Sequence, residues 1–179
     1  DLSLGLATSN YYEKIETDST ASARQKSQAG NYWDSFINLN FDYDKRNQKF
    51  ETSEGFRTRY LIDLPIISKT NSLTNTLNYQ YYTELYENNI SNFSIYLKAV
   101  DSITNDDVKL SERIFLPSNK LRGFERGKVG PKDGDDFIGG NYATAINFST
   151  SLPQLLENSQ NVDFIAFLDI ANIWGVDYN

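Results

Sequence analysis

Residues 33–44 read Trp-Asp-Ser-Phe-Ile-Asn-Leu-Asn-Phe-Asp-Tyr-Asp. From Ile37 to Tyr43 the odd positions are apolar, and the even positions between them hold Asn or Asp. Because successive side chains of a β-strand point to opposite faces, this alternation predicts a strand with one apolar and one polar face.

The same period of two recurs in six further segments along the chain. It is weak over residues 1–9 and clear over residues 56–66, 73–86, 93–99, 142–152 and 164–170. Residues 10–32 are rich in Ser, Thr, Ala and charged residues and predict a long loop. No segment has a convincing helical period. The pattern therefore predicts an all-β chain of about seven antiparallel strands that run up and down.

The composition argues against several classes of protein. The chain of 179 residues contains no His, Cys or Met. It therefore lacks the residues for a Ser-His-Asp triad, a thiolate nucleophile, a disulfide framework or a His- or Cys-ligated metal. The formal net charge of -7 argues against a nucleic-acid partner. We expect no enzymatic activity, no cofactor and no metal site.

The acidic residues give no sign of a catalytic or calcium site. Residues 133–136, Asp-Gly-Asp-Asp, lack the twelve-residue pattern of a calcium-binding loop and are better interpreted as a solvated acidic turn. A glycosidase would need a pair of carboxylates, and no pair stands out among the many Asp and Glu residues.

Two architectures fit the alternating pattern. The mean hydropathy is -0.54, and no run of about 18 apolar residues could form a membrane helix. A transmembrane β-barrel has such a composition, because its strands alternate apolar residues facing lipid with polar residues facing the lumen. A soluble β-sandwich or jelly roll also alternates. The aromatic content of 14%, with Tyr and Trp near several strand ends, favours the barrel and its interfacial aromatic girdles.

The lengths of the connections favour the barrel as well. If the strands run up and down, the two longest connections, residues 10–32 and 103–138, fall at the same end of the sheet. Outer-membrane barrels have long extracellular loops and short periplasmic turns. In that frame the extracellular connections are residues 10–32, 67–72 and 103–138, and the periplasmic ones are residues 45–55, 87–92 and 153–162.

Residues 121–142 carry three short motifs in a fixed order. These are Leu121-Arg122-Gly123-Phe124, Gly130-Pro131 and Gly139-Gly140-Asn141. Farther along, residues 167–174 form an Asp-containing strand that ends in Trp, and residues 43–47 and 54–56 flank a turn. In this order the motifs resemble the bacterial surface antigen family, the superfamily of outer-membrane assembly factors whose central member is BamA. The resemblance covers residues 33–175.

The resemblance implies a role for the long loop. In this family the loop folds back into the barrel lumen, and its Arg, here Arg122, pairs with an acid on the inner wall. The implied partner is Asp169, since a guanidinium offers a planar fork of donors that suits a carboxylate. Gly123 would allow close approach or a positive φ, and Phe124 would wedge the loop against the lumen.

Two positions depart from the family pattern. Where relatives often have Glu on the strand after the loop, this chain has Asn147, which could hydrogen-bond Arg122 without adding charge. Residues 116–119, Leu-Pro-Ser-Asn, stand where relatives often show Gly-Gly. The loop clasp implied by the resemblance therefore rests on a single carboxylate.

By resemblance, the whole protein would fold and insert β-barrel proteins into the bacterial outer membrane. Its partners would be outer-membrane lipid, unfolded outer-membrane protein clients and assembly lipoproteins. We expect residues 1–179 to be a partial barrel domain, with POTRA domains before it and closing strands after it. The alternatives are a polypeptide exporter or translocation-and-assembly relative of the same superfamily and, in another class, a soluble β-sandwich binding module.

Overall fold

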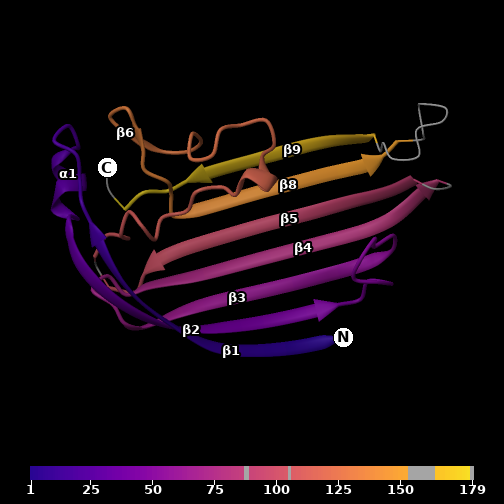
Figure 1. Cartoon of the computed structure of the whole chain (residues 1–179), viewed down its shortest axis with the longest axis horizontal. Coiled ribbons are helices and arrows are strands. Elements are labelled where there is room, and N and C mark those ends of the chain that lie inside the picture. Colours follow the sequence, from indigo (N-terminus) through magenta and orange to yellow (C-terminus); the bar gives the residue numbers. More distant parts are fainter. Residues whose placement is uncertain (87–88, 105, 153–163, 178–179) are drawn as a thin grey trace.

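The computed structural model describes residues 1–86, 89–104, 106–152 and 164–177. Its main feature is one antiparallel sheet of seven strands in the order β1-β2-β3-β4-β5-β8-β9, which is not closed (Figure 1). The strands are β1 (Leu2–Ile15), β2 (Gly30–Asp44), β3 (Gly55–Ile67), β4 (Ser72–Tyr86), β5 (Asn89–Ser102), β8 (Tyr142–Ser151) and β9 (Ile165–Trp174). The predicted up-and-down arrangement of about seven strands is confirmed.

The first long connection is shorter than the sequence indicated. Residues 10–15 extend β1, residues 30–32 begin β2, and a short helix, α1 (Ala23–Ser27), lies between them. The prediction of a plain loop without a helix is therefore wrong at these residues. The local cause is a capping box, in which the Ser22 side chain accepts from the Gln25 backbone N–H and the Gln25 side chain accepts from that of Ser22.

Two other predicted connections also differ in detail. β5 begins at Asn89, so the predicted turn over residues 87–92 is shorter than expected. The long connection before β8 contains a 3₁₀ turn, η1 (Ser118–Lys120), and a small hairpin of β6 (Lys132–Asp133) and β7 (Asp136–Phe137). The acidic residues 133–136, which the sequence predicted to form a turn, make the turn of this hairpin. The predicted turn over residues 153–162 lies outside the described residues.

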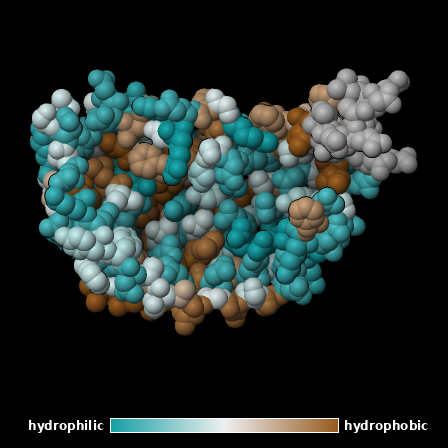
Figure 2. Space-filling model, in the orientation of Figure 1, coloured by the Kyte–Doolittle hydropathy of each residue, from teal (hydrophilic) through white to brown (hydrophobic). Residues whose placement is uncertain are grey.

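One face of the sheet is apolar and exposed. In register across the first five strands lie Leu4, Phe41, Tyr60, Leu77 and Leu97. Large side chains of this face are exposed on all seven strands of the sheet. Figure 2 shows hydrophobic residues along its lower edge, beneath β1 and β2, while the middle of the view is largely hydrophilic. An apolar face of this extent indicates contact with lipid or another apolar partner.

The opposite face is polar, and the long loop covers part of it. The buried hydrophobic cluster lies between loop residues such as Val108, Ile114 and Leu116 and the inner face of β5, β8 and β9. A β-sandwich would bury its core between two sheets. The main sheet packs on a loop instead, which argues against the soluble sandwich. Among the described residues, no helix is long and apolar enough to cross a membrane.

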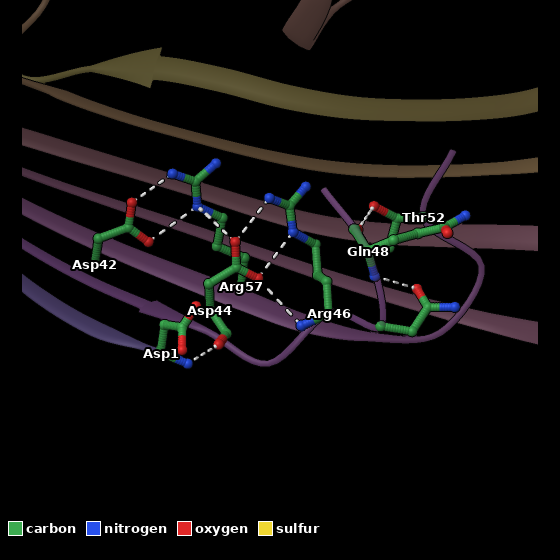
Figure 3. A network of polar contacts seen from close by, with 8 residues as sticks. Asp1, Asp42, Asp44, Arg46, Gln48, Thr52 and Arg57 are labelled. Carbon is green, nitrogen blue, oxygen red and sulfur yellow. Dashed lines mark hydrogen bonds and ion pairs between the residues drawn. The ribbon is translucent and has the colours of Figure 1, made fainter. Parts of the chain in front are cut away.

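On the polar face, ion pairs between Asp and Arg side chains connect β2, β3 and the turn between them (Figure 3). Arg57 forms a bidentate ion pair with Asp42, and its Nε lies 3.8 Å from Asp44. Asp44 also accepts from Arg46 at the backbone N–H (3.1 Å), Nε (2.9 Å) and Nη2 (2.8 Å). Elsewhere on this face Asp63 accepts from Asn38. Arg57 thus links the ends of β2 and β3 at this turn.

Candidate functional site: the loop clasp

The long loop reaches the inner wall at η1. Leu121, directly after η1, packs against the hydrophobic cluster, which places the next residue over the middle of β8 and β9. The apolar contact thus sets the position of Arg122.

Arg122 and Asp169 meet in a bidentate ion pair. Arg122 Nε donates to Asp169 Oδ2 at 2.7 Å and Nη2 donates to Oδ1 at 2.6 Å, while the Arg122 backbone N–H donates to Oδ2 at 2.9 Å. The Asp169 side chain is 3% exposed and that of Arg122 is 34% exposed. The hydrogen bond to Asp169 raises the pKa of Arg122 above its ordinary value. The pair therefore joins the loop to β9 with both groups charged.

An aromatic ring completes the setting of the guanidinium. Phe167 lies two residues before Asp169 and on the same face of β9, and its ring centroid is 3.9 Å from Arg122 Cζ. A guanidinium stacks favourably on an aromatic face, and because Phe167 is 52% exposed the gain here is that of a solvated contact.

Asn147 takes a different partner from the one expected. The sequence suggested a hydrogen bond to Arg122. The structure places the Asn147 amide on the other member of the pair, donating to Asp169 Oδ1 at 2.8 Å and to the Lys120 carbonyl at 2.9 Å. Asn147 lies directly opposite Asp169 in the register of β8 and β9. An acceptor-only Glu could not donate to these oxygens, so the amide suits this clasp.

We expect Asn147→Ala to lower the free energy of unfolding by about 1–2 kcal/mol, because the part-buried Lys120 carbonyl and the buried Asp169 carboxylate each lose a donor. Chemical denaturation of the full-length protein in detergent measures the change. Ser149→Ala, on the same face of β8, is the matched control. An equal effect in the two variants would contradict the assigned role.

Two motif residues near the ion pair lie in the open. Gly123 has a φ of +83°, which explains the glycine, and a side chain there would meet open space, so close approach is not the reason. Phe124 is 62% exposed and borders a small pocket formed by the loop itself. It does not wedge the loop against the wall as the resemblance implied.

The remaining motif residues fit the loop against the end of β9. Gly130 has a φ of +106°, and a Cβ there would lie 2.9 Å from Ile173 Cβ. Pro131 accepts from the Ile138 backbone N–H, which closes the small hairpin. Asn141 is buried and bonds the Gly175 carbonyl through its backbone N–H.

The Gly139-Gly140 pair sits where backbones meet. A Cβ on Gly139, whose φ is +69°, would lie 2.8 Å from the Ile114 carbonyl oxygen. A Cβ on Gly140 would lie 2.6 Å from the Trp174 carbonyl oxygen. Both contacts are with backbone atoms. A side chain on Gly139 would push two segments of the loop apart, and one on Gly140 would push the loop away from β9.

We expect Gly140→Ala to destabilise the protein by about 1–2 kcal/mol, as is usual for an overpacked contact. Heat-modifiable mobility of the full-length protein in gels reports the loss as a lower unfolding temperature. Gly134→Ala, in the same loop but with nothing near its Cβ position, controls for the loss of a glycine. Its own cost comes only from its φ of +63° and should be smaller.

Sequence reasoning missed a second ionic contact of the loop. Lys109 lies at 1% exposure against Glu13, Asp34 and Glu112. No local signal marks it, because Glu13 and Asp34 are 96 and 75 residues away in the chain. Among the described residues, no group of three or more His, Cys, Asp or Glu could hold a metal ion.

Comparison with known families agrees with this geometry. The family model for the Omp85 superfamily domain matches residues 1–179. The chain belongs to the Omp85 superfamily. Omp85 proteins are outer-membrane β-barrels that act in assembly and transport and are in general not enzymes. No curated protein matches the chain at a significant level.

The fold of this Omp85 chain is similar to a solved barrel. It matches the crystal structure of BamA from Haemophilus ducreyi lacking POTRA domains 1–3, with a TM-score of 0.76 and 20% sequence identity. The match covers 97% of this chain and 38% of that one. The seven-stranded sheet is thus similar to part of a BamA barrel.

Proposed function

We propose that this Omp85 chain is one wall of the barrel of a BamA-like factor that folds and inserts β-barrel proteins into the bacterial outer membrane. The observation that carries the proposal is the clasp, in which Arg122 of the long loop meets Asp169 on the inner wall. The apolar outer face supports a position in lipid. An open sheet in lipid would leave unpaired backbone groups at its edges, so further strands must close the barrel. POTRA domains would form the rest of the protein.

The proposed mechanism is physical rather than chemical. A client strand would add by β-augmentation to an open strand edge of the barrel. Within the main sheet, β2, β3, β4, β5 and β8 are paired on both sides, so these strands provide a stable wall. The clasp would hold this wall in the shape that the open edge needs. The partners would be outer-membrane lipid, unfolded barrel clients and assembly lipoproteins.

Reconstitution of the full-length protein tests the proposal. Proteoliposomes that contain it are mixed with a urea-unfolded eight-stranded barrel protein, and folded client is followed by its heat-modifiable mobility. We expect faster folding than in empty liposomes of the same lipid. Folding at the same rate would contradict an assembly role. Release of a passenger polypeptide across the bilayer without client folding would indicate an exporter instead.

A further inference from the structure

The loop contains a buried cation that the clasp does not use. Lys109 Nζ lies 2.5 Å from Asp34 Oδ2, 2.6 Å from Glu13 Oε1 and 3.4 Å from Glu112 Oε1. The ring centroid of Tyr32 is 4.7 Å away. Lys109 is 1% exposed and the Asp34 side chain 0%. We call Lys109, Glu13, Asp34 and Glu112 the Lys109 cluster.

The Lys109 cluster fastens the loop to the first two strands. Glu13 is near the end of β1 and Asp34 is near the start of β2. Neighbouring contacts reinforce this attachment. The Leu110 backbone N–H donates to Gln28 Oε1 at 2.8 Å, and Ser111 Oγ donates to Glu13 Oε1 at 2.8 Å.

The same short segment also contacts the opposite edge of the sheet, at the end of β9. The Val108 backbone N–H donates to Asp177 Oδ2 at 2.8 Å, and Arg113 Nη2 lies 3.5 Å from the same oxygen. Asp177 follows the end of β9 and also accepts from Asn141. β1 and β9 are the two edges of the sheet. In Figure 1 the end of β1 and the end of β9 lie at the same left-hand side.

We propose that residues 108–113 form a brace that ties the ends of β1 and β2 to the end of β9, with Lys109 as its positioning residue. The brace spans the concave side of the curved sheet and limits how far its edges can separate. It acts apart from the Arg122–Asp169 clasp, which joins the loop to the middle of β9. The inference goes beyond the proposed function, since it concerns the shape of the wall whatever the protein handles.

The charges explain why Lys109 carries the brace. Burial alone lowers the pKa of Lys109, but the hydrogen bonds with Asp34 and Glu13 and the charge of Glu112 raise it above its ordinary value. Without the ammonium, a fully buried Asp34 would face two other carboxylates. A buried charge stripped of its partner is strongly unfavourable, so the segment would move until water reached these acids.

The distance between the two edges tests the brace. Residues 1–179 contain no cysteine. Spin labels can therefore be attached through Lys14→Cys on β1 and Asn172→Cys on β9, which are both exposed positions. The full-length protein, with any other cysteine replaced, is studied in lipid nanodiscs without clients by electron–electron double resonance. We expect Lys109→Met to broaden the distance distribution and shift it to longer values, and Lys109→Arg to restore it in part.

Two controls make the result specific. Lys128→Met is the same substitution at an exposed position of the same loop and should leave the distribution narrow. Arg122→Ala breaks the clasp but not the brace, so it should broaden the distribution by clearly less than Lys109→Met does. If Lys109→Met does not fold, the variant that adds Asp34→Asn and Glu112→Gln removes the repulsion between the carboxylates and serves instead.

An unchanged distance distribution in the variant without Lys109, even if its unfolding temperature is lower, overturns the brace. Equal broadening by Arg122→Ala also overturns it. Neither readout depends on assembly activity.

Discussion

We expect Arg122→Ala in the full-length protein to lower the free energy of unfolding by about 3 kcal/mol, near the low end of the range for breaking a buried ion pair. The cost arises mainly at Asp169, which is 3% exposed and would keep its charge with only the Asn147 amide and one backbone N–H as donors. The partial exposure of Arg122 keeps the loss below the upper end of that range. Denaturant unfolding in detergent, followed by Trp fluorescence, measures it.

Three comparisons separate the ion pair from a general effect of the loop. Arg126→Ala removes an exposed Arg from the same loop and should change stability by less than about 0.5 kcal/mol. Arg122→Lys keeps the charge but loses the two-donor geometry of the guanidinium, so we expect a loss of unfolding free energy between those of Arg122→Ala and Arg126→Ala. In a double-mutant cycle, Arg122→Ala and Asp169→Ala should together cost much less than the sum of the two single losses.

The same variants bear on the proposed function. If the clasp holds the barrel in an assembly-competent shape, Arg122→Ala should also slow client folding in proteoliposomes at a temperature where the barrel stays folded. Undiminished assembly together with undiminished barrel stability would refute the role assigned to the clasp.

The strands could be predicted from the sequence because their signal is local. The alternation from Ile37 to Tyr43 places Leu39 and Phe41 on one face whatever the rest of the chain does, and the register with β3 follows from matching apolar faces. The pairing of Arg122 with Asp169 came from the resemblance, since nothing local to either residue indicates the other. The structure adds the geometry of that pair.

The loop contacts could not be predicted, because they depend on where distant segments lie. Lys109 is an ordinary charged residue in the sequence, and only the fold brings Asp34 and Glu13 to it. Asn147 could be placed on the inner face, but its choice of Asp169 depends on the register of β8 with β9. The helix α1 was missed because its five residues are too few to show a period.

The outer face offers the second large expected effect. Leu97, toward the middle of β5, is exposed on the apolar face beside Leu77 of β4 and Thr144 of β8. If this face lies in lipid, Leu97→Arg should cost about 2–4 kcal/mol, since an arginine near the bilayer midplane loses its hydration. On a face exposed to water, the same substitution would change stability by only about 0.5 kcal/mol. Equilibrium folding into lipid vesicles measures the difference.

The inner face supplies the matched substitution. Thr74 of β4 borders a polar cavity of about 220 Å³ between the loop and the wall, beside Asp63. An arginine at this position can reach both the carboxylate and water, so Thr74→Arg should be tolerated where Leu97→Arg is not. The contrast depends on which face meets lipid rather than on the charge itself. Equal tolerance of both substitutions would show that the apolar face is not in the membrane, and the barrel-wall proposal would then fail.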